Sequence, residues 1–103
     1  MIRHIVALRF RKTVTEAEKA AIYSDLAALG GHIEGILDFR SFVNSSVEQP
    51  LVRGFDNLFW FDFRDAGVRD AYLVDAAHQA VGARIVAATE GGPDGVFVFD
   101  VAL

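Results

Sequence analysis

The apolar pattern is densest between residues 57 and 64, where the sequence reads Asn-Leu-Phe-Trp-Phe-Asp-Phe-Arg. Aromatic residues bounded by turn formers predict a β-strand. Alternate residues of a strand point to opposite faces, and most positions on both faces of this strand are apolar. Such a strand belongs in the middle of a sheet that is covered on both sides. A chain of 103 residues can cover one face with its own helices. We therefore expect a second copy of the chain to cover the other face.

The segments around this strand carry either strand-like or helix-like spacing, and turn residues separate them. In order, the predicted elements are a strand over 2–10, a helix over 15–29, a strand over 36–45 followed by a loop to residue 54, the strand over 57–64, a helical region over 66–89 that breaks near residues 75–76, and a strand over 95–101. The apolar stripes expected to face the sheet are Ile22, Leu26, Leu29 and Ile33 in the first helix and Ala71, Val74, His78, Val81, Ile85 and Ala88 in the second region.

The order β-α-β-β-α-β predicts an α+β, ferredoxin-like fold over a single domain, 1–103. Its four-stranded antiparallel sheet has the first and third strands in the centre and both helices on one face. The helix-free face would carry Ile5, Ala7, Leu58 and Trp60, which are too apolar to leave in water. This face predicts a homodimer in which two sheets pack across a two-fold axis.

Charge and composition argue against several kinds of partner and indicate where the protein is located. The formal net charge is -4 with no basic run, which argues against nucleic acid or an anionic membrane as partner. The absence of cysteine excludes disulfides, thiolate catalysis and zinc-thiolate sites. No uncharged apolar segment approaches the ~20 residues that span a bilayer, and the N-terminus lacks the apolar core of a signal peptide. We expect a cytoplasmic protein without a cofactor.

Four polar residues are the candidates for chemistry: His4, Asn57, Tyr72 and His78. We expect His4 and Asn57 near the same end of neighbouring strands, with both side chains toward the helices. His78 lies on the second apolar stripe and points back at the sheet. Polar tips at one end of an apolar cleft are typical of a small-molecule site. The apolar residues expected to line this cleft are Leu26, Phe59 and Val81.

The chemistry open to these side chains is proton transfer. A neutral histidine can act as a general base near pH 7, because its unperturbed pKa is ~6.5. Tyr72 can orient His78 or hydrogen-bond a substrate carbonyl and the negative charge that grows on it. This set suits enolisation, aldol closure or lactonisation. Hydrolysis is not favoured, since the sequence offers neither a Ser-His-Asp set nor paired carboxylates.

Purely structural roles are the alternative to these catalytic and binding roles. A histidine on an apolar face is more often a hydrogen-bonded core residue than a catalyst. A metal site is not expected, because the third histidine, His32, lies at a helix end far along the chain from the others. The acidic residues of the central strand and the second helical region are interpreted as solvating, capping or pairing with Arg64 and Arg69; they are Asp62, Asp65, Asp70 and Asp75.

An ordered set of motifs runs nearly end to end. Its members are Arg3 to Phe10, Thr15 to Glu18, Gly35-Ile36 with Phe39, Asn44-Ser45, the Phe-rich strand, Arg69 to Leu73 and His78. This set resembles the stress-responsive dimeric α+β barrel proteins. The resemblance implies a homodimer whose two sheets close into a barrel.

The best-understood enzyme type of that family is a plant polyketide cyclase, which folds a linear polyketide by aldol condensation. The resemblance implies that His4, Tyr72 and His78 match its working residues. This chain departs from the family at two places. Asn57 stands where the cyclase has a further histidine, and Asp75-Ala76 stands where many relatives have His-Pro.

The sequence therefore predicts a homodimer with a helix-side cavity for a small apolar carbonyl or aromatic compound and cyclase-like acid-base chemistry. Two alternatives stay open. One is a non-catalytic, stress-associated oligomer or binding module with a closed cavity. The other is a cofactor-independent monooxygenase, which rests on the fold alone.

Overall fold

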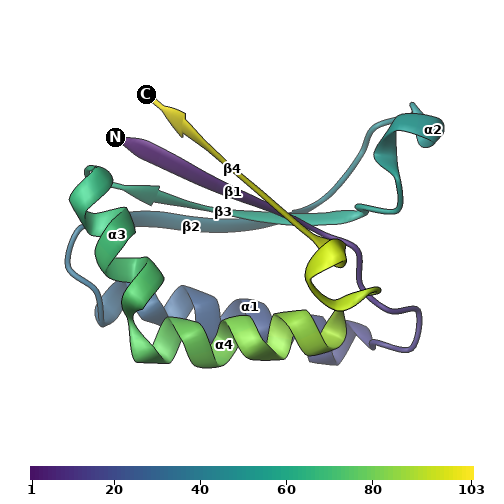
Figure 1. Cartoon of the computed structure of the whole chain (residues 1–103), viewed down its shortest axis with the longest axis horizontal. Coiled ribbons are helices and arrows are strands. Elements are labelled where there is room, and N and C mark those ends of the chain that lie inside the picture. The colour runs from purple at the N-terminus through teal and green to yellow at the C-terminus, as the bar shows by residue number, and fades with distance from the viewer.

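The computed structural model covers residues 1–103 and has one sheet with its long helices on one side (Figure 1). The strands are β1 (Ile2–Leu8), β2 (Ile36–Val43), β3 (Asn57–Phe63) and β4 (Val96–Ala102), and the α-helices are α1 (Glu16–Ala28), α2 (Gln49–Val52), α3 (Ala66–Val74) and α4 (Ala76–Ala88). Short 3-10 turns follow α1 at Leu29–Gly31 and precede β4 at Gly92–Gly95. Apart from α2, the order confirms the predicted ferredoxin-like fold.

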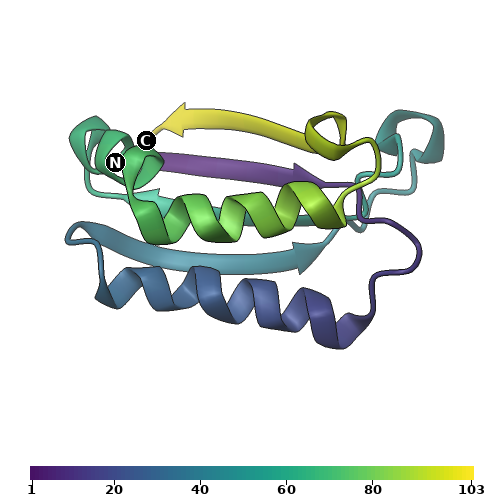
Figure 2. The same cartoon turned by 60° about the horizontal axis from the view of Figure 1, so that its bottom comes forward.

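The four strands lie in the order β2-β3-β1-β4, and every neighbouring pair is antiparallel. The first and third strands are therefore the central pair, as predicted. Helices α1 and α4 run side by side under the sheet, and α3 lies at one end of the same layer (Figure 2). The short helix α2 stands on the opposite side of the sheet, beyond the ends of the strands (Figure 1).

The core lies between the sheet and the helices. Its centre is the row of alternate phenylalanines on β3, which is buried completely or nearly so. Helices α1 and α4 cover this row with buried aliphatic residues, and α3 adds an aromatic one. The core members are Val6, Leu8, Ile22, Leu26, Leu29, Ile33, Phe59, Phe61, Phe63, Val68, Tyr72, Val81 and Ile85.

The first predicted stripe is confirmed in full, and the second only beyond the break. Ala71 is exposed and Val74 is 74% exposed, whereas Val68 and Tyr72 are the buried residues of α3. The chain stops being helical at Asp75, where ψ is 131°, so α3 and α4 have separate axes. A stripe extrapolated through that break therefore lies on the wrong side of α3.

Three local features set the ends of the helices. Thr15 caps α1 by accepting the N–H of Glu18, at the spacing that the sequence predicted. Asp65 caps α3 in the same way. Gly35 enters β2 with φ 93°, and a Cβ at this position would lie 2.5 Å from a methyl of Val68. Only glycine lets the start of β2 and the start of α3 approach this closely.

The helix-free face carries apolar side chains that one chain leaves partly in water. Phe97 is 56% exposed and Phe99 is 43% exposed, and Trp60 is half-buried. The guanidinium of Arg3 lies 4.6 Å from the centre of the Trp60 ring, a cation–π arrangement. No helix of the chain has both the length and the apolar character needed to cross a bilayer.

Candidate functional site

Three candidate residues meet at one end of the helix-covered layer. His4 comes from β1, Tyr72 from α3 and His78 from α4. The His4 ring lies edge-on to Tyr72, with centroids 5.5 Å apart, and the Tyr72 and His78 rings stack at 3.7 Å. His4 is 5% exposed and Tyr72 is 1% exposed. The structure therefore brings together three of the four residues that the sequence singled out.

Asp75 fixes the relation between Tyr72 and His78. Its backbone N–H donates to the carbonyl oxygen of Tyr72 at 3.2 Å and closes α3. Its carboxylate accepts the backbone N–H of His78 at 3.0 Å and opens α4, and this bond holds the pKa of Asp75 below its usual value. The second carboxylate oxygen bonds Nε2 of His32 at 2.8 Å. The sequence predicted the break near Asp75 but not this tie to the end of the α1 segment.

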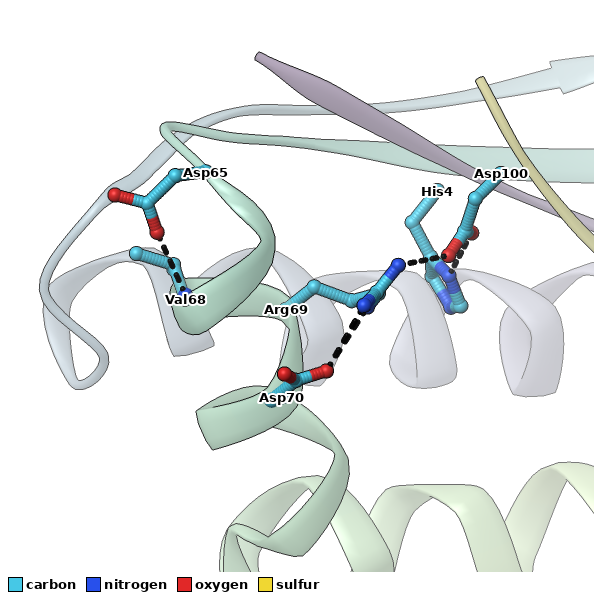
Figure 3. A network of polar contacts seen from close by, with 6 residues as sticks. All are labelled: His4, Asp65, Val68, Arg69, Asp70 and Asp100. Carbon is cyan, nitrogen blue, oxygen red and sulfur yellow. Dashed lines mark hydrogen bonds and ion pairs between the residues drawn. The ribbon is translucent and has the colours of Figure 1, made fainter. Parts of the chain in front are cut away.

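His4 has a carboxylate partner that sequence reasoning did not assign. Its Nδ1 lies 2.7 Å from Oδ1 of Asp100, on β4 (Figure 3). The other oxygen of Asp100 accepts from the guanidinium of Arg69 at 3.3 Å, and Arg69 also bonds Asp70. The signal lay in the strand register, because His4 and Asp100 are directly opposite in the β1–β4 pair. Residues opposite each other on one face of an antiparallel pair are within contact distance.

Several polar atoms of this cluster have no partner within the chain. Nδ1 of His78 is buried without a hydrogen bond. Neither the Tyr72 hydroxyl nor Nε2 of His4 takes part in any hydrogen bond of the chain. Burial raises the pKa of Tyr72 and lowers the pKa of His78. At pH 7 the cluster thus presents a protonated phenol and a neutral His78 ring.

The placement of Asn57 corrects one prediction. In the β1–β3 pair Asn57 lies opposite Leu8, whereas His4 lies opposite Phe61. The start of one antiparallel strand is beside the end of its neighbour, so Asn57 and His4 are at opposite ends of the sheet. Four residues of strand separate them, or about 13 Å at 3.3 Å per residue. Asn57 does not join the cluster.

The residues predicted to line a cleft are packed in the core. Leu26 and Phe59 are almost fully buried, and Val81 is buried with them. The main surface pockets have other linings. The best-defined, of about 480 Å³, lies on the helix-free side between α2 and the sheet, with Phe55 and Phe97 in its wall. A ligand-lining role for Leu26, Phe59 and Val81 stays a prediction.

One acidic residue of the central strand was misjudged. Asp62 is buried, and it accepts two hydrogen bonds from Arg3, at 2.8 and 3.0 Å. The prediction of a solvating carboxylate was wrong because Asp62 lies opposite Arg3 in the β1–β3 register. The structure also contains no group of three or more histidine and acidic side chains arranged to hold a metal ion.

Comparisons with known proteins agree with this fold. A dimeric ferredoxin-like protein of unknown function from Jannaschia sp. CCS1 is 27% identical, with a TM-score of 0.89 over 99% of this chain and 98% of that chain. A protein of Arabidopsis thaliana is 20% identical, with a TM-score of 0.88 over 100% and 95%. The hydroxynitrile lyase of Passiflora edulis is 14% identical, with a TM-score of 0.82 over 99% and 92%.

No curated protein sequence matches the chain. The two likenesses below 25% identity show the fold alone. The family model described as the stress responsive A/B barrel domain, however, matches residues 2–103, which is nearly the whole chain. The chain therefore belongs to the stress responsive A/B barrel domain family.

Proposed function

We propose that the cluster of His4, Tyr72 and His78 binds the carbonyl group of a small apolar or aromatic compound and supports proton transfer on it. The observation that carries this proposal is the set of polar atoms without partners. Buried polar groups in native proteins are nearly always hydrogen-bonded, and exceptions call for an explanation such as a ligand or a catalytic role. Nδ1 of His78 is such a buried atom, and the Tyr72 hydroxyl and Nε2 of His4, which have no hydrogen bond within the chain, lie in the same cluster. A ligand that bonds all three atoms would account for them together.

The proposed chemistry follows from the protonation states. Tyr72 keeps its proton, because burial raises its pKa, and it can donate to a carbonyl oxygen and to the negative charge that grows there. A neutral histidine can take a proton from the carbon beside that carbonyl. Together these roles suit enolisation and aldol closure, with no cofactor.

A homodimer through the helix-free face belongs to the same proposal. Phe97, Phe99 and Trp60 leave an apolar surface on that side, and such surfaces mark association sites. Structural neighbours from Jannaschia sp. CCS1 and Thermobifida fusca YX are dimeric ferredoxin-like proteins. The site lies on the opposite face of the sheet, so the dimer would stabilise the sheet without covering the cluster.

The Passiflora edulis neighbour is a hydroxynitrile lyase, so a fold of this kind carries enzymes. At 14% identity that likeness assigns no substrate to this chain. The packed core favours a second candidate, the non-catalytic oligomer. Leu26 and Phe59 fill the space where a cavity was expected, and none of the main pockets reaches His78.

A ligand screen separates the two candidates. Small phenols, β-diketones and lactones are tested by thermal shift and by NMR of the histidine rings. We expect at least one class to raise the melting temperature and to move the ring signals of His78. Tyr72→Phe and His78→Ala should remove that effect. Tyr23→Phe is the matched control, because Tyr23 is a second core tyrosine whose buried hydroxyl has no partner, and it packs against Phe10 and Phe59 rather than His78.

If the ligand binds both site variants as well as the unchanged protein, the site assignment is wrong. If no compound of these classes binds, the non-catalytic oligomer is the better description. Sedimentation or light scattering of the same samples tests the dimer independently of any ligand.

A further inference from the structure

We infer that His4 is the proton acceptor of this site and that Asp100 and Arg69 are the residues that position it. The orientation of His4 stands on the contacts alone. The transfer of a proton to it rests on the function proposed above. The experiments below are chosen so that the two can fail separately.

The first step is the proton on Nδ1 of His4. A carboxylate has only acceptor sites, so the 2.7 Å contact with Asp100 requires that Nδ1 carry the hydrogen. In the neutral ring the lone pair is then on Nε2, and no group of the chain donates to that atom. The structure thus presents His4 in the form that can accept a proton.

The second step is the contrast with His78. No carboxylate contacts the His78 ring, because the carboxylate of Asp75 bonds the backbone N–H of His78 instead. Nδ1 of His78 is buried without a hydrogen bond of ordinary geometry, so its tautomer is less firmly fixed than that of His4. The Tyr72 carbonyl and the Asp75 carboxylate favour a positive charge on this ring, but burial outweighs them and lowers its pKa. His78 is suited to hold or polarise the ligand, and His4 is suited to take the proton.

The third step is the role of Arg69. Its guanidinium bonds the Asp100 oxygen that His4 does not use, and it bonds Asp70 on its own helix. Asp100 is therefore held from both sides, by β1 through His4 and by α3 through Arg69 (Figure 3). A carboxylate with both oxygens engaged has little freedom to turn away from the ring. Arg69 acts on His4 only through Asp100, so it is a positioning residue.

The proposed step balances in atoms and charge. The C–H bond beside the carbonyl breaks and its proton moves to Nε2 of His4. The electron pair moves toward the carbonyl oxygen, where the Tyr72 hydroxyl donates a hydrogen bond. The ring becomes an imidazolium, and its charge faces the Asp100 carboxylate at Nδ1. Attack of the enolate carbon on a second carbonyl forms a C–C bond and an alkoxide, which then takes the proton from Nε2 of His4. Alternatively, the proton returns to the carbon, and either route completes the cycle without a co-reactant.

Nitrogen-15 NMR of the ligand-free protein tests the orientation. The spectra are recorded at increasing pH until the ring signals of His4 and His78 no longer change, so that the neutral rings are compared. We expect His4 to carry its proton on Nδ1 in the unchanged protein. Asp100→Ala should shift most of the His4 population to the Nε2-protonated form. Arg69→Met should give a smaller shift in the same direction, and Arg69→Lys should restore most of the original state.

Arg84→Met is the control, since it removes a surface pair with Asp25 between α4 and α1 and should leave the His4 signals unchanged. A His4 ring protonated on Nε2 in the unchanged protein would overturn the inference. An unaltered tautomer in Asp100→Ala would also overturn it, provided that the backbone spectrum shows a folded chain.

Turnover of a compound found in the screen tests the second part of the inference, the transfer of a proton to His4. His4→Gln should lower kcat by about 10²-fold or more with little change in KM, the usual range for loss of a general base. Asp100→Ala should lower kcat in the same sense. If His78→Ala abolishes turnover while His4→Gln does not, the base is His78 and the inference fails, while the proposed function stands. If no compound is bound, the proposed function fails and the NMR result on His4 remains.

Discussion

The two faces of the sheet differ in how far their apolar side chains are buried. On the helix-covered face, Phe61 and Phe63 are completely buried by the chain's own helices. On the other face, Phe97 and Phe99 keep about half of their surface in water. Each face also carries charged pairs: His4 with Asp100 on the covered face, and Arg3 with Asp62 and Arg40 with Asp38 on the bare one. The comparison teaches that a single chain completes one core and leaves apolar rings on the other face partly exposed, which is the surface that the proposed homodimer would bury.

The largest effect should come from the covered face. Phe61→Ala removes a fully buried ring from the middle of the core, and such changes cost about 3–5 kcal/mol of unfolding free energy. Phe99→Ala should cost much less in dilute protein, because its ring is still partly in water. Urea denaturation of both variants measures the difference. Equal losses at low protein concentration would contradict the contrast between the faces.

The next effect is specific to the bare face. Phe99→Glu should weaken the dimer by about 100-fold or more, because an unpaired carboxylate would be buried at the contact. Val74→Glu is the control, since Val74 is exposed on α3 at the helix side. Analytical ultracentrifugation over a range of concentrations gives both dissociation constants. If the Phe99→Glu protein stays dimeric, the dimer contact is not on the helix-free face.

Asp62 tests the polar group on the bare face. Asp62→Ala removes the two hydrogen bonds of Arg3 and leaves Asp38 as its remaining acidic neighbour, and we expect a measurable loss of unfolding free energy. Asp62→Asn keeps one acceptor and should lose less. Thermal and urea unfolding measure the stability loss of each variant. An effect of Asp62→Ala within error of zero would show that the pair of Arg3 and Asp62 does not contribute to stability.

A smaller effect is expected at the joint between α3 and α4. Asp75→Ala removes the cap of α4 and should lower the melting temperature by about 5 °C, which corresponds to a typical cap in a domain of this size. Asn is nearly as good a cap as Asp, so Asp75→Asn should restore most of that loss. Circular dichroism melts compare the two. Equal melting temperatures for the Ala and Asn variants would show that the pair with His32 matters more than the cap.

The smallest effect is a loss of stability in acid. Hydrogen bonds from the backbone N–H groups of Val68 and His78 hold the pKa values of Asp65 and Asp75 below the ordinary value. A carboxyl whose folded pKa is depressed contributes its stability above the unfolded pKa of ~3.9 and loses it as pH falls through the folded pKa. Burial lowers the pKa of His78, so unfolding free energy should already fall somewhat as pH drops below the ordinary histidine pKa of ~6.5. The two carboxyls should add a further decline below about pH 4. A double variant with Asn at both positions should flatten that decline.

Much of the fold could be predicted because alternation and turn residues are local signals. The central position of β3 followed from its apolar character on both faces. The short helix α2 was missed, since four residues that include Pro50 carry no helical period. The error at Ala71 and Val74 arose because a periodic pattern does not reveal that the helix axis changes direction at Asp75.

The site was predictable in its members but not in its pairing. His4, Tyr72 and His78 stood out because they are polar residues on faces that otherwise bury apolar ones. Asp100 could not be assigned from spacing, because its partner His4 is 96 positions away and only the strand register brings the two together. Asn57 was placed wrongly for another reason: β1 and β3 run antiparallel, so the start of β3 lies beside the end of β1 and away from His4.

The close approach of Gly35, just before β2, to Val68 restricts what can stand at position 35. Val68 lies one helical turn before Tyr72 on the same buried side of α3, and a Cβ at position 35 would lie 2.5 Å from one of its methyl groups. A side chain there would require Val68 or the start of α3 to shift, and the same helix carries Tyr72. A residue that touches neither a ligand nor a catalytic group thus constrains the helix that supplies the phenol of the site.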